Sequence, residues 1–275
     1  MLTFLQSGPV QVALLLSGAA ALLCGALGLF AVLRSQAFAG HALADVSSAG
    51  GAGSLLFGLS PLLGFLLFGV AGVAGLEILQ PRRAAGRDEA AGILLGAGLG
   101  LTALLLHFCL TGQGTAGAAQ AVMFGAMFSA PPGAALWACV LAGGCLLVLA
   151  LIARPLLLAS LDDELARVAG MGVRVLGLVF LLLLALGVTL AAMTVGAALA
   201  TALLIGPAAS GLRLARGPVG AAFVSMALGL LSCWGGIALA YVSYGWTPGR
   251  TWPVSFFIVA LVLVFYLASG LRRRA

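Results

Sequence analysis

Two ionisable side chains, His41 and Asp45, stand four residues apart in the otherwise apolar and small-residue stretch AFAGHALADVSSAGGAGS. This spacing places both side chains on one face of a helix. An imidazole nitrogen and a carboxylate oxygen are ligands that divalent transition metals accept. The pair therefore predicts half of a metal site inside a membrane helix. The alternative is a pair that only neutralises itself while it packs helices together.

Two ligands from one chain are too few for a closed metal site. A two-fold dimer would supply two histidines and two aspartates, which is the number of ligands that a tetrahedral site uses. We therefore expect a homodimer in which His41 and Asp45 of both copies meet. This hypothesis fails if the two copies of the helix lie far apart.

The composition indicates what positions these residues. Hydrophobic residues make up 63% of the 275 residues and charged residues only 7%, whereas soluble domains carry about 25% charged residues. So much apolar surface requires lipid around it, and the 40 glycines favour closely packed membrane helices. We predict an all-α, polytopic transmembrane bundle formed by residues 1–275 as a single permease domain. The net charge of +6 does not indicate nucleic-acid binding, because the arginines are scattered.

A membrane helix needs about 20 apolar residues, and the chain contains about nine such stretches. The seventh stretch is short and reaches Pro207, so a broken or re-entrant segment and only eight full spans are the alternative. Gly196 and Pro207 are expected to break or pack this segment. We expect the first apolar run to stay as a membrane helix, because no positive region precedes it. The predicted spans are residues 10–33, 38–58, 61–79, 89–110, 133–153, 173–193, 195–211, 219–240 and 253–270.

The arginines predict the orientation of the bundle. With nine spans and the N-terminus outside, twelve of the thirteen arginines fall on the inner face and only Arg250 falls outside. This is the asymmetry that the positive-inside rule describes. We therefore expect a multi-pass protein of a bacterial inner membrane, with its C-terminus inside. Asp45 would then lie about 12 Å deep, near the midplane of the bilayer.

The longest polar inner segment is residues 159–172, ASLDDELARVAGMG. Asp162 is a plausible N-cap, and the acids after it face the positive end of a short helix. A short helix at the inner face would suit the docking of a soluble partner. The other ionisable residues are expected to have local roles: His107 in helix contacts, Glu77 in a charge pair near Arg82 and Arg83, and Asp88 and Glu89 in capping.

Several catalytic signatures are missing. The chain contains no lysine, so it cannot contain a GxxxxGK[ST] phosphate loop. No catalytic triad, HExxH motif or dinucleotide fingerprint is present. We therefore expect a transport subunit rather than an enzyme, without a tightly bound cofactor. If ATP drives transport, another chain must bind the nucleotide.

Three segments resemble the zinc/manganese-type permease family of ABC importers. They are SQAFAGHALADVSSAG at 35–50, DDELARVAGMGV at 162–173 and VGAALATALLIGPAASGLRLAR at 195–216, in the order and with the spacing of the family. The likeness spans most of the chain, and the third segment is the most specific. The chain departs from the family in two respects: the family's acidic residue in the last outer loop is not evident near Gly245, and the order of the two ionisable residues is exchanged. The family commonly places the aspartate before the histidine, whereas here His41 comes first and Asp45 second.

The resemblance implies a homodimer of permeases with two cytoplasmic ATP-binding subunits and a periplasmic metal-binding protein. It implies alternating access around a midplane site for a divalent metal ion, with zinc ahead of manganese. It also implies that the segment 159–172 couples the permease to the ATPase. The coupling residues would be Asp162, Asp163, Glu164, Leu165, Ala166 and Gly170.

Three other functions compete with this interpretation. A permease for a metal chelate, such as a siderophore or haem, is usually longer and would not need the His–Asp pair. An ion-coupled secondary transporter often shows an inverted repeat, and none is detectable. A membrane scaffold would not explain the acidic inner helix. An ATPase gene beside this one would favour the importer over the secondary transporter and the scaffold.

Overall fold

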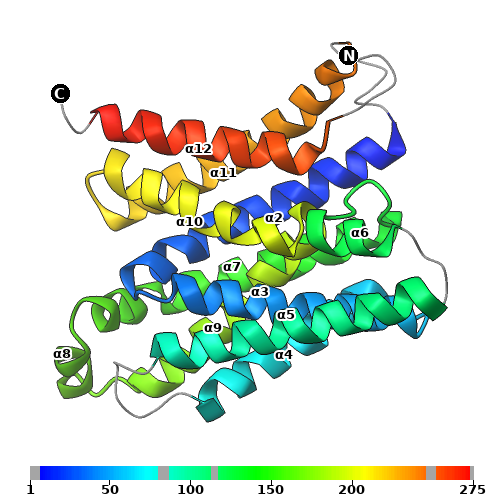
Figure 1. Ribbon diagram of the computed structural model, residues 1–275. Helices are drawn as coiled ribbons and strands as arrows, with labels where there is room; N and C mark the ends of the chain where they lie inside the picture. Colours follow the sequence, from blue (N-terminus) through cyan, green and yellow to red (C-terminus); the bar gives the residue numbers. More distant parts are fainter. Residues whose placement is uncertain (1–6, 80–86, 113–116, 246–251, 273–275) are drawn as a thin grey trace.

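All regular structure in the described part of the chain is helical. The computed structural model describes residues 7–79, 87–112, 117–245 and 252–272 (Figure 1). The nine helices of 18 residues or more match the nine predicted stretches, so the predicted all-α polytopic bundle is confirmed. The helices are α2 (Gly8–Leu33), α3 (Ala37–Leu56), α4 (Pro61–Leu79), α5 (Arg87–Gly112), α6 (Ala118–Phe124), α7 (Pro132–Leu161), α8 (Asp163–Val168), α9 (Val173–Val195), α10 (Ala197–Leu214), α11 (Pro218–Ser243) and α12 (Val254–Arg272).

Eight of the described helices are long and apolar enough to cross a membrane, and α3 is the long helix that is not among them. Its small and polar residues lower its hydropathy. Most of its residues are nevertheless buried, because α4, α5, α9 and α10 pack around it. A helix that is largely shielded from lipid does not need an apolar surface. The eight apolar spans and the nine long helices are therefore consistent with each other.

Contacts with neighbouring helices explain why α3 tolerates its polar residues. The hydroxyl of Ser47 lies 2.9 Å from that of Thr189 in α9, and the hydroxyl of Ser48 lies 2.9 Å from that of Thr102 in α5. Buried hydroxyls that find partners avoid the cost of desolvation. Small residues then allow close packing. A Cβ atom on Gly50 would overlap the carbonyl oxygen of Gly64 in α4, and a Cβ atom on Gly64 would overlap that of Gly50.

The seventh predicted stretch is a continuous helix, α10. Gly196 separates α9 from α10 and has a φ of +103°, a backbone conformation that glycine adopts at little cost. Pro207 does not end the helix, contrary to the sequence-based expectation. It is buried inside α10, which continues to Leu214. A proline inside a membrane helix is tolerated where neighbouring helices support the backbone, and α2, α3, α11 and α12 pack against α10.

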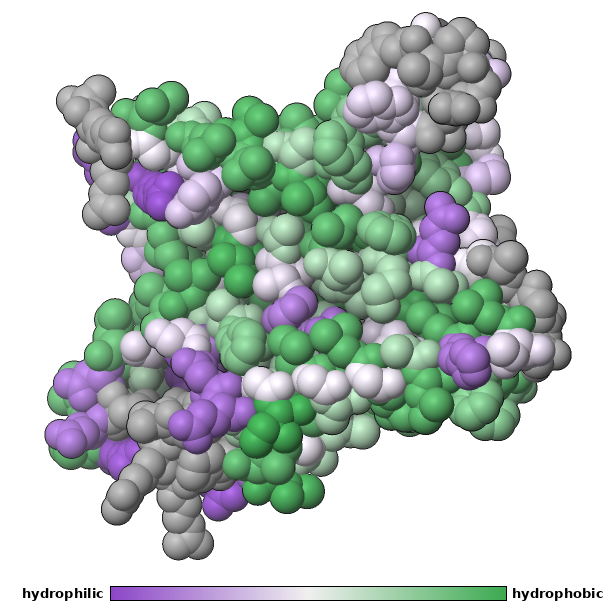
Figure 2. Space-filling model, viewed as in Figure 1, coloured by the Kyte–Doolittle hydropathy of each residue, from purple (hydrophilic) through white to green (hydrophobic). Residues whose placement is uncertain are grey.

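The bundle has two distinct ends. The short helix α8 lies at one end and α6 at the other, and α2 begins at the α6 end while α12 finishes at the α8 end (Figure 1). Hydrophilic residues gather at the α8 end, whereas most of the visible face between the ends is hydrophobic (Figure 2). The arginines used to predict the topology include Arg82, Arg83, Arg250, Arg273 and Arg274, which lie outside the described residues. The orientation in the membrane therefore stays a prediction.

Candidate functional site

His41 and Asp45 face each other on α3. The Nε2 atom of His41 lies 3.7 Å from the Oδ2 atom of Asp45. The Asp45 side chain is 3% exposed and the His41 side chain 31% exposed. Within the described part of the chain, Asp45 Oδ2 is buried without a hydrogen-bond partner. A buried carboxylate oxygen in this state has a lone pair available for a ligand.

The separation of the two atoms suits a shared ion better than a direct hydrogen bond. Nitrogen and oxygen donors that each lie about 2.1 Å from one ion, at a tetrahedral angle, are about 3.4 Å apart. The observed 3.7 Å is close to this value and is longer than a normal hydrogen bond. A small adjustment of either side chain would therefore place both donors on one divalent ion.

A third residue, Thr201 in α10, contacts the pair. Its Oγ1 atom lies 2.6 Å from the Nδ1 atom of His41. Thr201 was not predicted from the sequence, because a threonine within an apolar helix carries no signal of its own. The contact joins residues that are 160 positions apart, so only the fold brings them together.

The described residues of one chain do not complete a metal site. They contain no group of three or more His, Cys, Asp and Glu side chains that could hold an ion. His41 is nonetheless partly exposed, whereas Asp45 lies behind it in the bundle. Figure 2 shows a small hydrophilic area in the middle of the otherwise hydrophobic face, where α3 passes between α10 and α5. A polar imidazole at this depth is unfavourable in contact with lipid.

The other two ionisable residues considered in the membrane have local contacts. The ring of His107 on α5 packs against that of Phe108, with centroids 5.9 Å apart. Glu77 pairs with Arg174 at 3.5 Å, and so joins α4 to α9. A charge pair was predicted for Glu77, but with the neighbouring arginines as its partners. Arg82 and Arg83 lie outside the described residues.

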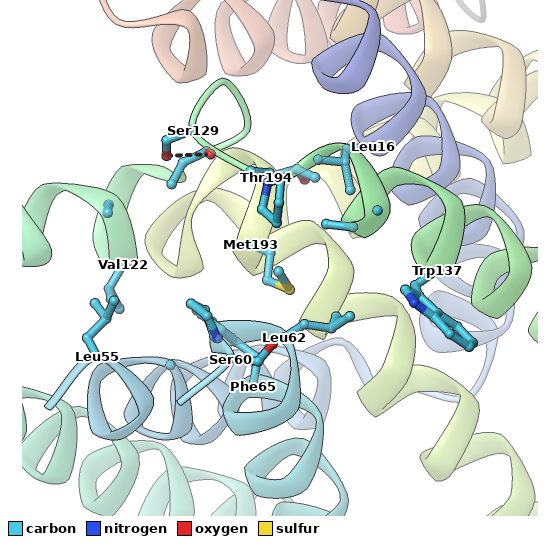
Figure 3. A pocket seen from close by; sticks show the side chains of 18 residues that line it. Leu16, Leu55, Ser60, Leu62, Phe65, Val122, Ser129, Trp137, Met193 and Thr194 are labelled. Atoms are coloured by element: carbon cyan, nitrogen blue, oxygen red, sulfur yellow. Dashed lines mark hydrogen bonds between the residues drawn. The ribbon is translucent and has the colours of Figure 1, made fainter. Parts of the chain in front are cut away.

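A cavity of about 480 Å³ lies towards the α6 end of the bundle, between α2, α3, α4, α6, α7 and α9. Figure 3 shows Met193 in the middle of this cavity, with Val122 and Leu55 on one side and Trp137 on the other. No ionisable side chain lines it, and its polar side chains are hydroxyls. The cavity is therefore separate from the His41–Asp45 pair and lacks the ligands that a divalent cation requires.

The acidic segment at residues 159–172 contains the short helix α8. The Oδ1 atom of Asp162 accepts hydrogen bonds from the backbone N–H groups of Glu164 and Leu165, both at 2.9 Å. This confirms the predicted N-cap. The helix itself is shorter than the predicted segment, because residues 159–161 belong to α7.

The other end of α8 is closed by a Schellman motif. The N–H of Gly170 donates to the carbonyl of Arg167, and the N–H of Met171 donates to that of Ala166. The φ of +75° at Gly170 makes this turn possible. Ala166 is fully buried against the bundle.

The model of one protein family matches residues 6–270, nearly the whole chain, and that family is described as "ABC 3 transport family". The chain belongs to the ABC 3 transport family. Two relatives carry names that state a transported ion. "Manganese transport system membrane protein MntC" of Listeria innocua is 29% identical over 209 residues, covering 75% of this chain and 72% of the relative. "Manganese import system permease protein ScaB" of Streptococcus parasanguinis is 29% identical over 233 residues, covering 84% and 81%.

A solved structure has the same fold. "PsaBC from Streptococcus pneumoniae in complex with Fab" superimposes with a TM-score of 0.80 at 24% identity, covering 98% of this chain and 93% of the other. At this level of identity the similarity establishes the architecture alone. The family match and the eight apolar spans together make this chain a multi-pass membrane protein of a transport family.

Proposed function

We propose that this chain is the membrane permease of an ABC importer that moves a divalent transition metal ion, and that His41 and Asp45 bind the ion. The observation that carries the proposal is the 3.7 Å separation of His41 Nε2 and Asp45 Oδ2, with the carboxylate buried and one of its oxygens unpartnered. Membrane proteins rarely retain such groups without a function.

The proposed ion is manganese. Zinc was the first expectation from the sequence, but the relatives described above carry names that state manganese transport or import and so do not support that order. The donor chemistry accepts both ions, because imidazole binds zinc well and carboxylate oxygen suits manganese. Selectivity in a cell also depends on the supply of each metal and on the protein that delivers it.

Two copies of the chain would complete the site. One chain contributes two donors, and His41 is the one exposed on an apolar face. A second copy that covered this face would shield the imidazole from lipid and add two more donors. We therefore propose that the interface of a homodimer includes the exposed part of α3 around His41.

Two further partners are proposed, one at each end of the bundle: ATP-binding subunits at the α8 end and a metal-binding protein at the α6 end. The chain contains no lysine and therefore no GxxxxGK[ST] phosphate loop, so in this proposal separate ATP-binding subunits supply the energy. Leu165 and Val168 are exposed apolar residues on α8, which suits insertion into a groove of such a subunit. A periplasmic metal-binding protein would deliver the ion at the α6 end. The proposed orientation has the N-terminus outside. ATP binding to the partner subunits would then switch the bundle between outward-open and inward-open states.

Transport in proteoliposomes tests this proposal. The vesicles contain this chain, its ATP-binding partner and its metal-binding protein, and ATP-dependent uptake of Mn²⁺ is compared for wild type, His41→Ala and Asp45→Ala. The chain's other histidine provides the matched control, His107→Ala. We expect uptake to fall by more than about tenfold in the first two variants and to stay near wild type in the control. Uptake that persists in both site variants would contradict the assigned site. Absence of Mn²⁺ uptake by an assembled wild-type complex would contradict the manganese assignment and favour a chelated substrate.

A further inference from the structure

We propose that Thr201 is a positioning residue for His41, which fixes the imidazole ring so that Nε2 is the nitrogen offered to the metal ion. This inference rests on the proposed function, because it concerns the same site. It starts from the 2.6 Å contact between Thr201 Oγ1 and His41 Nδ1. That contact links α10 to α3. The family match assigns no role to Thr201.

The chemistry of imidazole determines what the contact does. A neutral imidazole carries its proton on one ring nitrogen and a lone pair on the other. The structure gives the contact without a direction, since a hydroxyl both donates and accepts. The proposed direction is that Nδ1–H donates to the Thr201 oxygen, which holds the ring in the tautomer protonated at Nδ1. The lone pair is then on Nε2, and Nε2 is the atom that faces Asp45 Oδ2. Histidine ligands of metals are commonly fixed in this way through their second nitrogen.

The requirement of the ion selects between the two tautomers, because a ligand nitrogen must carry its lone pair. The Nδ1 contact, at 2.6 Å, lies within hydrogen-bonding range, whereas the Nε2 contact, at 3.7 Å, does not. The ring is therefore held from its Nδ1 side, and its Nε2 atom has no hydrogen bond to Asp45 that an ion would have to replace. If the proton were on Nε2, it would occupy the position in which the ion must bind.

Packing between α3 and α10 places the hydroxyl at this distance. Leu204, one turn after Thr201, is fully buried, and its Cδ2 atom would lie 2.8 Å from a Cβ atom on Gly40. The absence of a side chain at Gly40 therefore lets α10 approach α3 next to His41. A movement of α10 relative to α3 would withdraw the hydroxyl and release the ring. The orientation of the ligand thus depends on the position of α10.

The first test measures the tautomer directly, without transport. The chain has only two histidines, so ¹⁵N NMR of the histidine-labelled full chain contains two imidazole rings, and His41→Ala identifies the signals of His41. At a pH at which the ring is neutral, we expect His41 to be protonated at Nδ1 in the wild type. Thr201→Val removes the hydroxyl with little change in shape, and we expect a mixture of tautomers in that variant. A wild-type ring protonated at Nε2, or a spectrum unchanged in Thr201→Val, would overturn the proposal.

The second test measures the consequence for the ion. In the reconstituted complex we expect Thr201→Val to raise the Mn²⁺ concentration for half-maximal uptake by about 10- to 100-fold, the usual effect of losing an outer-shell partner. Thr201→Ser keeps the hydroxyl and should remain within about threefold of wild type. Thr111→Val makes the same chemical change on α5, where the hydroxyl donates to the His107 carbonyl, and should have no effect.

The outcomes separate the two proposals. If His41→Ala and Asp45→Ala abolish uptake while Thr201→Val retains the wild-type Mn²⁺ dependence, the metal site stands and the role of Thr201 is wrong. An equal loss in Thr201→Ser and Thr201→Val would also overturn that role, because the hydroxyl would then not be the group that matters. If uptake persists in His41→Ala and Asp45→Ala, the proposed site itself fails, whatever the result for Thr201.

Discussion

Gly125 and Gly196 meet backbone to backbone, and neither position has space for a side chain. A Cβ atom on Gly125 would overlap the carbonyl oxygen of Thr194, and a Cβ atom on Gly196 would overlap that of Met123. Both glycines have positive φ values, +83° and +103°. The segment after α6 is thus fixed to the α9–α10 break, where the N–H of Ala126 also donates to the carbonyl of Met193 at 3.2 Å.

Gly196→Ala should therefore destabilise the bundle. The new Cβ atom has backbone as its nearest neighbour and sits on a residue with positive φ, so the cost should exceed about 1 kcal/mol. Thermal unfolding in detergent, followed by size-exclusion chromatography, measures the effect. Gly143→Ala is the matched control, because it lies inside α7 with open space around its Cβ position. Equal stability of the two variants would refute the steric argument.

Asp162→Ala should loosen the start of α8. The variant removes the carboxylate that accepts from the N–H groups of Glu164 and Leu165, which costs about 0.5–2 kcal/mol of local stability. We expect faster amide hydrogen exchange in residues 163–168 and less transport for each ATP hydrolysed. Asp162→Asn retains a capping oxygen and should remain close to wild type. If both variants exchange at the wild-type rate, the cap does not stabilise α8.

Val168→Asp should weaken binding of the ATP-binding subunit without unfolding the permease. Val168 is 86% exposed on α8, so a charge there meets solvent in the isolated chain and an apolar groove in the proposed complex. A pull-down at graded concentrations of the ATP-binding subunit should show at least a tenfold loss of affinity. Val168→Ala should lose much less. Wild-type affinity in the aspartate variant would place the docking surface elsewhere.

Glu77→Gln should have a small effect on stability. The ion pair with Arg174 is 3.5 Å long, and the Arg174 side chain is 90% exposed, so solvent screens the attraction. Exposed pairs of this kind contribute no more than about 1 kcal/mol. Thermal unfolding should show a shift of at most a few degrees. A collapse of the folded protein would mean that the pair is shielded by lipid or by a partner.

Much of the fold could be predicted from the sequence, because apolar stretches and their boundaries are local features. The nine long helices, the Asp162 cap and the break at Gly196 all depend on neighbouring residues in the chain. Pro207 was misjudged, since the packing that keeps α10 continuous involves helices that are distant in sequence. The short helix α6 was not predicted, because its seven residues are too few to show a membrane-spanning pattern.

The candidate site could be predicted only in part. The spacing of His41 and Asp45 on one helix indicated that they share a face. Their separation of 3.7 Å and the burial of the aspartate required the structure. The hydroxyl of Thr201 could not be predicted, because α10 reaches α3 only through tertiary packing.

The binding of Mn²⁺ to the purified, assembled complex tests the central claim most directly. Electron paramagnetic resonance distinguishes free from bound Mn²⁺, so a titration gives both the affinity and the number of ions for each permease chain. The shared His41–Asp45 site predicts one tightly bound ion for every two chains, lost in His41→Ala and in Asp45→Ala and retained in His107→Ala. Tight binding that survives in both site variants would show that the ion is held elsewhere, and one ion for every chain would contradict the shared site.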